Sequence, residues 1–205
     1  MPVVDDFWLF LSASFLLWIT PGPDTLYILA RTLSQGRLAG VLSVLGISTG
    51  ILAHTLFAAI GLSAILMTSA LAFTAIKLAG AAYLIYLGVQ ALRSRPTSSS
   101  PTRIAAQSRS KIFWQGFVTN LLNPKIALFF LAFLPQFVDP NSASHPAGLF
   151  LYLGGMFVVG GSLWCLLLVA VAQRVRTTIK PSAIITNITG LVYIGLGLNL
   201  LRAKL

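Results

Sequence analysis

The sequence predicts an all-α integral membrane protein with six transmembrane helices, and three observations support this fold class. Hydrophobic residues make up 57% of the 205 residues and charged residues only 9%, whereas about a quarter of the residues in a soluble domain are charged. Apolar stretches long enough to cross about 30 Å of hydrocarbon recur along the chain. They lack the sustained alternation of a membrane β-barrel strand, so the backbone must form its hydrogen bonds within helices.

The expected spans set the topology of the chain. They cover about 7–30, 38–62, 72–93, 112–137, 147–171 and 181–201. The net charge of +10 does not indicate nucleic-acid binding, because most basic residues fall in three loops on one side of the membrane: Arg31, Arg37, Arg93, Arg95, Arg103, Arg109, Lys111, Arg174, Arg176 and Lys180. By the positive-inside rule, loops 31–37, 94–111 and 173–180 are cytoplasmic and both termini lie outside.

The N-terminus agrees with this orientation. It carries Asp5 and Asp6 and no basic segment, so the first apolar stretch is expected to be a retained span and not a cleaved signal peptide.

The chain contains an internal repeat. The segment GAAYLIYLGVQALR at 80–93 resembles GLVYIGLGLNLLR at 190–202, and the second and fifth spans each begin with two glycines six residues apart. Because each unit has three spans, the second unit must enter the membrane from the opposite side. We therefore expect two inverted three-helix repeats, 1–93 and 112–205, joined by a basic, Ser/Pro-rich cytoplasmic linker at 94–111.

The first and fourth spans are interrupted in their middle. Each carries proline beside an ionisable residue, PGPD at 21–24 and NPK at 123–125. Proline removes a backbone donor and clashes with the preceding turn, so both helices are expected to break near the membrane midplane. Exposed backbone groups are tolerated there only when protein or a water-filled cavity covers them, and the two breaks are therefore expected to face each other.

The charged residues at these breaks form the candidate transport site. Asp24 and Lys125 are expected to be partners across the repeat, because a single charge inside the bilayer costs about 2.5–3.5 kcal/mol. Free N–H groups at a half-helix start attract a carboxylate, Lys125 adds to that attraction, and Asp24 suits an ammonium group. The predicted substrate is thus a zwitterion, and the predicted site residues are Pro21, Gly22, Pro23, Asp24, Asn120, Asn123, Pro124 and Lys125.

Four further residues are candidates for gating or proton coupling. Asp24 could take up a proton when its partner withdraws, because desolvation favours the neutral acid. His54 is either a hydrogen-bonded structural residue or a proton carrier, and Lys77 can reach the membrane surface. Gly46 and Gly50 form a G-x-x-x-G motif, which permits close helix approach. Trp18 and Trp164 are expected only to pack, and Cys165 to be a small buried thiol.

Several motifs together resemble the LysE/RhtB family of bacterial amino-acid exporters. They are TPGPD at 20–24, GISTGILAH at 46–54, KLAGAAYLIYLG at 77–88 and NLLNPKIALFFLAFLPQF at 120–137. The resemblance extends over essentially the whole chain. It places the family's PGP motif on Pro21 to Pro23, its NPK motif on Asn123 to Lys125, and a third-span motif on Lys77, Gly80, Tyr83 and Gly88.

The resemblance implies efflux of an amino acid or derivative across the bacterial inner membrane, driven by the proton or membrane gradient. From the residues we expect no enzyme activity, no cofactor and no metal. The partners are then the small-molecule substrate and membrane lipid, and the glycine-rich helix faces would allow a homodimer.

Other classes of protein stay open at this stage. A six-helix transporter of another metabolite or of a cation would share the fold, although one Cys and one His within the spans offer few ligands for a soft metal. A membrane enzyme would need a nucleophile with its base or a metal motif. A membrane scaffold would not need a charge at each helix break.

Overall fold

The computed structural model describes residues 6–62, 70–93, 106–138 and 146–174, together with residues 191, 194, 195, 198 and 201. The helices are α1 Phe7–Ile19, α2 Pro23–Gln35, α3 Arg37–Phe57, η1 Ala58–Leu62, α5 Ala70–Arg93, α6 Arg109–Leu121, α7 Pro124–Leu128, η2 Phe129–Phe133, η3 Leu134–Phe137 and α8 Pro146–Arg174. The described ranges contain no strand, as the fold class predicts. The sixth expected span lies almost entirely outside the described residues, and the inverted-repeat arrangement stays a prediction.

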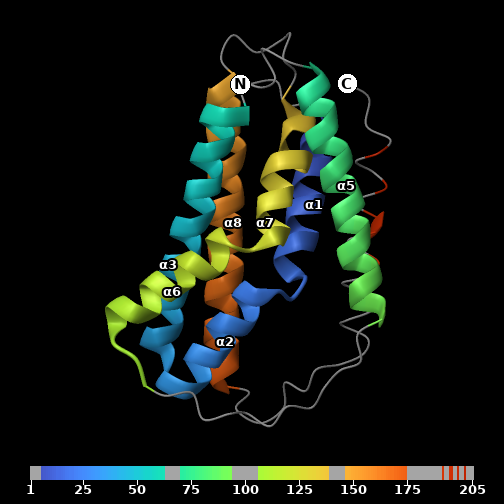
Figure 1. Ribbon diagram of the computed structural model, residues 1–205. Helices are drawn as coiled ribbons and strands as arrows, with labels where there is room; N and C mark the ends of the chain where they lie inside the picture. The colour runs from blue at the N-terminus through green and yellow to red at the C-terminus, as the bar shows by residue number, and fades with distance from the viewer. Residues whose placement is uncertain are drawn as a thin grey trace.

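Among the residues that the structure describes, two helices are individually long and apolar enough to cross a membrane. They cover Arg37–Leu62 and Pro146–Ala172. A third span forms when Arg109–Leu121 and Pro124–Phe137 are taken together, with a bend of 47° at the break. Helix α1 is apolar but shorter and continues into α2 after its own break (Figure 1).

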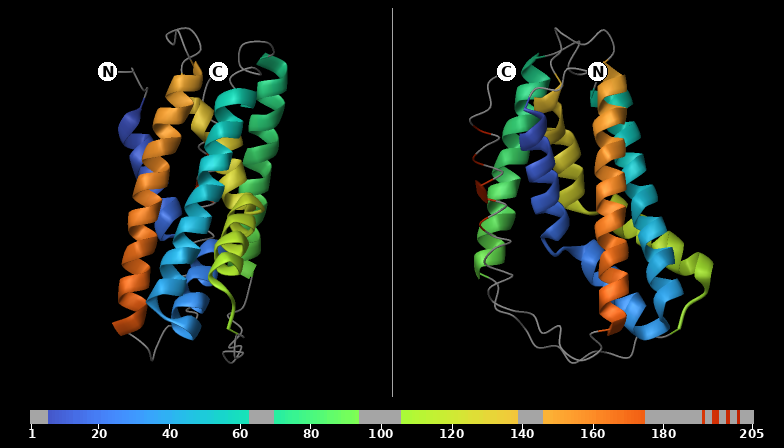
Figure 2. Two further views of the ribbon diagram at one scale, coloured as in Figure 1. Left: turned by 90° about the vertical axis from the view of Figure 1, so that its left-hand side faces the viewer. Right: turned by 180° about the vertical axis from the view of Figure 1, so that it is seen from behind.

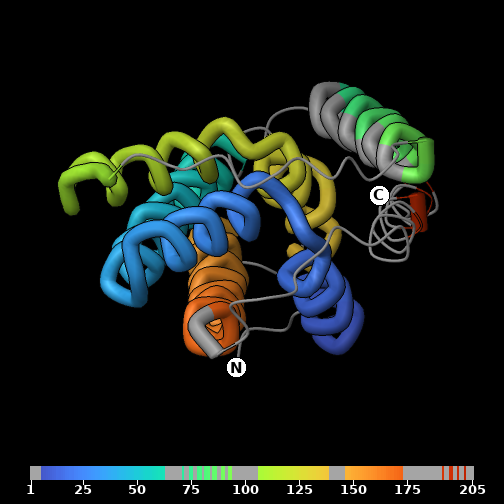
Figure 3. The backbone as a smooth tube through the Cα atoms, turned by 90° about the horizontal axis from the view of Figure 1, so that it is seen from below, coloured from blue at the N-terminus to red at the C-terminus, as the bar shows by residue number. Residues whose placement is uncertain are grey.

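The helices that carry the two breaks pack together around α3 and α8 (Figure 1). Viewed from below, α2, α3, α6 and α8 gather on one side, and α5 stands at the other side against the α7 and η2 segment (Figure 3). In the view from behind, α1 and α7 occupy the upper half and α2 and α6 the lower half (Figure 2).

Glycines bring α3 and α6 into close contact. A side-chain carbon on Gly46 would overlap the backbone carbonyl of Phe113, and one on Gly116 would lie 2.9 Å from the Ser43 carbonyl. Gly46 of the G-x-x-x-G motif therefore allows the backbones of α3 and α6 to approach closely. Small residues are common at helix contacts in membranes, because apolar side chains gain no hydrophobic free energy by moving from lipid into the protein.

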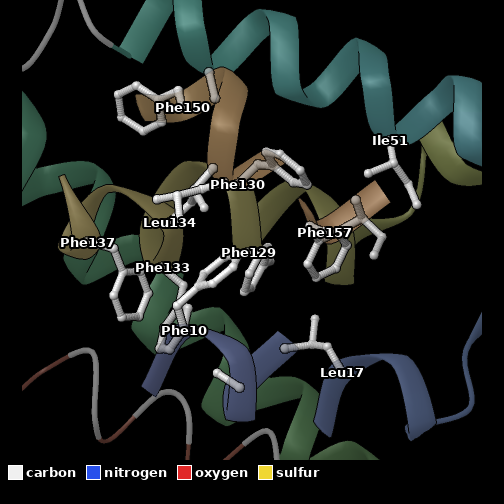
Figure 4. Close-up of a cluster of buried hydrophobic side chains, with 14 of the residues drawn as sticks. Phe10, Leu17, Ile51, Phe129, Phe130, Phe133, Leu134, Phe137, Phe150 and Phe157 are labelled. Carbon is white, nitrogen blue, oxygen red and sulfur yellow. The ribbon is translucent and has the colours of Figure 1, made fainter. Parts of the chain in front are cut away.

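Phenylalanines fill the upper half of the bundle. Phe10 of α1 packs on Phe129 and Phe137, with ring centroids 6.3 and 5.6 Å apart. Phe129 stacks on Phe157 of α8 at 4.5 Å. The close-up in Figure 4 shows these rings meeting between α1, the η2 and η3 turns and α8. We call Phe10, Phe129, Phe130, Phe133, Phe137, Phe150 and Phe157 the aromatic cluster; each is at most 2% exposed.

The predicted loop at 31–37 is wrong. Helix α2 continues to Gln35, and Gly36 alone, with φ of 87°, turns the chain into α3. Arg31 consequently lies inside α2 and is 6% exposed, because its guanidinium is hydrogen-bonded to Gln35 (3.0 Å) and Gln115 (3.2 Å). Positive φ is accessible to glycine without steric cost, which is why one residue suffices.

The ends expected on the cytoplasmic side do lie together. The N-terminal ends of α3 and α6 and the C-terminal ends of α5 and α8 are all at the lower end of the molecule in Figure 1. Arg37, Arg93, Arg109 and Arg174 occupy these helix ends. The side of the membrane that this end faces stays a prediction from the charge bias.

Candidate functional site

The first break separates α1 from α2. Helix α1 ends at Ile19, and Thr20 closes its last turn by donating its backbone N–H to Leu16. Pro21 and Pro23 supply no N–H, and Gly22 is extended. Pro23 starts α2 at the position where a missing donor costs least. The break leaves the last carbonyls of α1 available to partners outside the helix.

The second break separates α6 from α7. Leu122 and Asn123 leave the helical path, and Pro124 starts α7. Asn123 caps the new helix, because its Oδ1 accepts a hydrogen bond of 3.0 Å from the backbone N–H of Lys125. Proline at the first position and asparagine at the cap are both favoured helix starts.

The carboxylate of the first break binds to the second break. Asp24 Oδ2 accepts hydrogen bonds from the side-chain amides of Asn120 (2.8 Å) and Asn123 (2.9 Å). Asp24 is only 7% exposed and Asn120 is fully buried. The other carboxylate oxygen, Oδ1, has no hydrogen-bond partner among the described residues.

The ammonium group of the second break binds to the first break. Lys125 Nζ donates to the backbone carbonyls of Leu17 (3.1 Å) and Thr20 (3.0 Å) at the end of α1. Lys125 is 6% exposed. An ammonium group carries three N–H donors, so one remains for a further acceptor.

The two breaks thus bind each other, because the charged side chain of each is hydrogen-bonded to polar groups of the other. Within the described ranges, Asp24 and Lys125 form no ion pair within 4.0 Å; each charge is instead satisfied by polar groups of the opposite break. The expected partnership between Asp24 and Lys125 is therefore indirect, through the polar groups of the two breaks. Amides and carbonyls can stabilise a buried charge without cancelling it, so both charges stay available to a ligand.

Both charged residues line one cavity. Its walls come from α1, α2, α3, α7 and α8: Leu17, Trp18, Asp24, Thr25, Ile47, Ser48, Ile51, Lys125, Ile126, Phe157, Gly161, Trp164 and Cys165. The cavity has a volume of about 30 Å³, which holds about two water molecules and is too small for an amino acid. The structure therefore shows the site in a form too narrow to hold an amino acid.

The predicted gating residues have different surroundings. Gly50 packs on Asn120, so that an added side-chain carbon would lie 2.7 Å from Asn120 Oδ1. His54 is buried, lies 3.4 Å from the Asn120 carbonyl through Nε2 and stacks on Phe130 at 5.9 Å. Lys77 lies in α5, and its side chain is outside the described residues. His54 and Gly50 therefore contact the residue that holds Asp24.

Sequence reasoning missed several members of the site. Trp18, Trp164 and Cys165, expected only as core residues, also line the cavity. Ser48 of α3 and Ser162 of α8 share a hydrogen bond of 2.7 Å at its edge. Trp18 lies three residues before the first proline, and this proximity to the break was a signal that could have identified it.

An apolar helical bundle in which two broken helices enclose buried charges of both signs is the architecture of a membrane transporter. Comparison with known proteins agrees: the family model "LysE type translocator" matches residues 14–204. The chain belongs to the LysE translocator family.

Curated relatives cover nearly the full chain. An uncharacterized membrane protein of Bacillus subtilis is 32% identical over 93% of this chain and 95% of its own length. A homoserine/homoserine lactone efflux protein of Salmonella typhimurium is 33% identical over 83% of this chain and 82% of its own length. No solved structure matches the chain.

Proposed function

We propose that this protein exports an amino acid or an amino-acid derivative across the bacterial inner membrane, and that the cavity between the two breaks is its substrate site. The observation that carries the proposal is the pair of buried charges, Asp24 and Lys125, on the wall of one cavity. Among the described residues, Asp24 Oδ1 accepts no hydrogen bond, and Lys125 Nζ uses two of its three N–H donors. Family membership supports transport, and the Salmonella relative is named for efflux of homoserine and its lactone.

The unused positions suit the two charged groups that all α-amino acids share. Asp24 Oδ2 is occupied by amides while Oδ1 is unpartnered among the described residues, so Oδ1 accepts from the substrate ammonium. Lys125 Nζ has two of its three donors on α1 carbonyls, so the third binds the substrate carboxylate. The first turn of α2, whose Asp24 and Thr25 line the cavity, adds backbone N–H groups that favour an anion.

The rest of the wall favours a neutral side chain. Apart from Asp24 and Lys125, the lining residues are apolar, aromatic, hydroxyl or thiol groups. A second charge on the substrate would be buried there without a partner, which is costly in a low-dielectric site. The proposal therefore covers neutral amino acids, and homoserine belongs in the first set of compounds to test.

Transport requires the narrow cavity to widen and to open alternately to each side of the membrane. We propose that Asp24 couples this movement to the proton gradient. When the substrate ammonium leaves, the carboxylate loses a positive partner inside a buried site, and desolvation then favours its protonated form. The gradient would restore the charged form on the side where protons are scarce.

The test is efflux of labelled amino acids from cells that express the wild type, Asp24→Asn or Lys125→Ala at matched membrane levels. We expect the wild type to export neutral compounds of the panel, homoserine included, and both variants to lose at least about 90% of that efflux. Gly155→Ala is the matched control, because a side-chain carbon on Gly155 meets nothing within 4 Å.

The single cysteine gives an independent measure of binding. Cys165 lines the cavity with Asp24 and Lys125, and it is the chain's only cysteine. We expect an exported amino acid to slow alkylation of Cys165 by N-ethylmaleimide in the wild type and not in Lys125→Ala. If the wild type exports no amino acid, the proposed function is wrong; if both charge variants export normally, the proposed site is wrong.

A further inference from the structure

Trp18 holds an unpaired hydrogen-bond donor at the substrate cavity. Its indole Nε1 is buried and has no hydrogen-bond partner in the part of the chain that the structure describes, although Trp18 lines the cavity. A buried tryptophan usually finds a partner for its N–H group. Leaving such a donor unmet away from water costs free energy, so an unpaired one on a cavity wall points to a partner that is not part of the protein.

The fold fixes the indole ring in this place. The ring lies against α8, where it packs on Phe157 with centroids 5.6 Å apart. A side-chain carbon on Gly160 would overlap the ring, and one on Gly161 would lie 3.2 Å from Nε1. Two adjacent glycines therefore make the space that the ring occupies. A larger residue at position 160 would displace the indole, and one at position 161 would push its nitrogen by a few tenths of an ångström.

Trp18 also sits in the segment that binds Lys125. The neighbouring carbonyl of Leu17 and that of Thr20 both accept hydrogen bonds from Lys125 Nζ. The end of α1 consequently positions the ammonium group through its backbone and presents the indole through its side chain. Both groups are donors, and a substrate that meets both must offer acceptor oxygens.

We propose that Trp18 contacts the substrate directly and donates its indole N–H to a substrate oxygen, so that it contributes to both affinity and selectivity. This inference rests on the proposed function. The cavity then offers one unused acceptor, Asp24 Oδ1, and two donors, Lys125 Nζ and Trp18 Nε1. The Ser48 hydroxyl is already bonded to Ser162.

Two oxygens of a substrate could receive this hydrogen bond. One is the carboxylate, which every amino acid carries, and the other is a side-chain hydroxyl such as that of homoserine. Norvaline has nearly the same shape as homoserine and lacks the hydroxyl. Comparing the two compounds therefore separates the two sources of the acceptor.

The experiment measures uptake of labelled homoserine and norvaline into proteoliposomes that contain the wild type or Trp18→Phe. Phenylalanine keeps an aromatic ring and removes the N–H. We expect KM to rise roughly 2- to 10-fold if the acceptor is the neutral hydroxyl and roughly 10- to 150-fold if it is the charged carboxylate, while kcat changes less than about twofold. A rise for both compounds identifies the carboxylate, and a rise for homoserine alone identifies the hydroxyl.

A second pair of variants tests the same contact without changing Trp18. Gly161→Ala crowds the indole nitrogen, whereas Gly155→Ala on the same helix meets nothing within 4 Å. We expect Gly161→Ala to raise KM and Gly155→Ala to leave it unchanged. The homoserine concentration that half-protects Cys165 from N-ethylmaleimide, measured against each variant's own alkylation rate without homoserine, should rise in Trp18→Phe by the same factor as KM.

An unchanged KM and unchanged protection in Trp18→Phe would overturn the assignment while leaving the proposed function intact. Normal KM with a lowered kcat would also overturn it, since Trp18 would then act on the conformational change and not on binding. If the wild type transports neither compound and neither protects Cys165, the proposed function fails for these substrates and the role of Trp18 fails with it.

Discussion

The two helix breaks resemble each other in sequence and differ in the chemistry they present. The first break offers acceptors, namely the Leu17 and Thr20 carbonyls and the Asp24 carboxylate. The second offers donors, namely the amides of Asn120 and Asn123 and the Lys125 ammonium. Each break therefore binds the charge of the other, and neither can be satisfied alone.

The breaks also differ in how the following helix starts. Asn123 caps α7 through the Lys125 N–H, whereas α2 follows Gly22, which has no side chain to cap it. The uncapped start of α2 carries Asp24 and Thr25, which line the cavity. The cap fixes the start of α7, whereas the uncapped start of α2 leaves backbone donors for another group to bind.

Exchanging the two charges should break this complementarity most severely. In the double variant Asp24→Lys with Lys125→Asp, the new carboxylate would face the Leu17 and Thr20 carbonyls and the new ammonium would face amide N–H groups. Net charge is unchanged, but each charge meets groups of the wrong polarity. We expect efflux to fall at least about 100-fold, because buried charges without partners cost several kcal/mol.

Membrane insertion of the exchanged protein is checked by monodispersity after solubilisation. Efflux near the wild-type level would show that the pair needs only to be neutral and that the surrounding carbonyls and amides do not matter.

Asn123 should contribute more than Asn120. Both donate to Asp24, but Asn123 alone caps α7. Loss of an N-cap costs about 0.5–2 kcal/mol, so we expect Asn123→Ala to lower the thermal midpoint further than Asn120→Ala, and both to reduce efflux about tenfold or more. Thermal unfolding of the purified variants in detergent measures the difference. Equal midpoints would mean that the cap has no role in stability.

Gly22→Ala should have a moderate effect on the first break. Gly22 has an extended backbone with φ of −149°, which alanine adopts easily. The added carbon would lie 3.2 Å from Lys125 Nζ, so the ammonium group must shift by a few tenths of an ångström. We expect a several-fold rise in KM with little loss of stability, measured beside Gly155→Ala. An unaltered KM would indicate that Lys125 has freedom to move.

Tyr27→Phe should have the smallest effect, because it lies away from both breaks. The Tyr27 hydroxyl donates to the Ile112 carbonyl at 2.7 Å and so joins α2 to α6. A single hydrogen bond of this kind contributes about 0.5–1.5 kcal/mol. We expect a change in kcat of a few-fold at most and an unchanged KM in proteoliposomes. A larger change in KM than in kcat would place Tyr27 in the binding site.

The sequence predicted the breaks and the residues around them, because proline has a local effect that no tertiary contact removes. Pro21, Pro23 and Pro124 therefore interrupt their helices where expected. The partners of each charge were not predictable in the same way. Lys125 binds two backbone carbonyls. Every residue carries a backbone carbonyl, so the sequence does not indicate which ones will bind the ammonium group.

The misplaced loop at 31–37 has a related cause. Charged and polar residues at the end of a span are normally read as a loop, but Arg31 is buried by hydrogen bonds to Gln35 and Gln115. Gln115 lies 84 residues further along the chain, so the contact depends on how α2 and α6 pack. Similarly, the position of the Trp18 ring on the cavity wall depends on Gly160 and Gly161 of α8, which leave space for it.

The aromatic cluster has a consequence for the membrane barrier. Its seven phenylalanines are at most 2% exposed and offer water no hydrogen-bonding groups, so a continuous file of water is disfavoured between them, as in channels that close by dewetting. On the opposite side of the breaks, α2 and α6 are joined by polar contacts from Arg31 and Tyr27, which water can replace. The bundle therefore disfavours water at one end and can admit it at the other, and this difference would keep ions from leaking past the proposed substrate site.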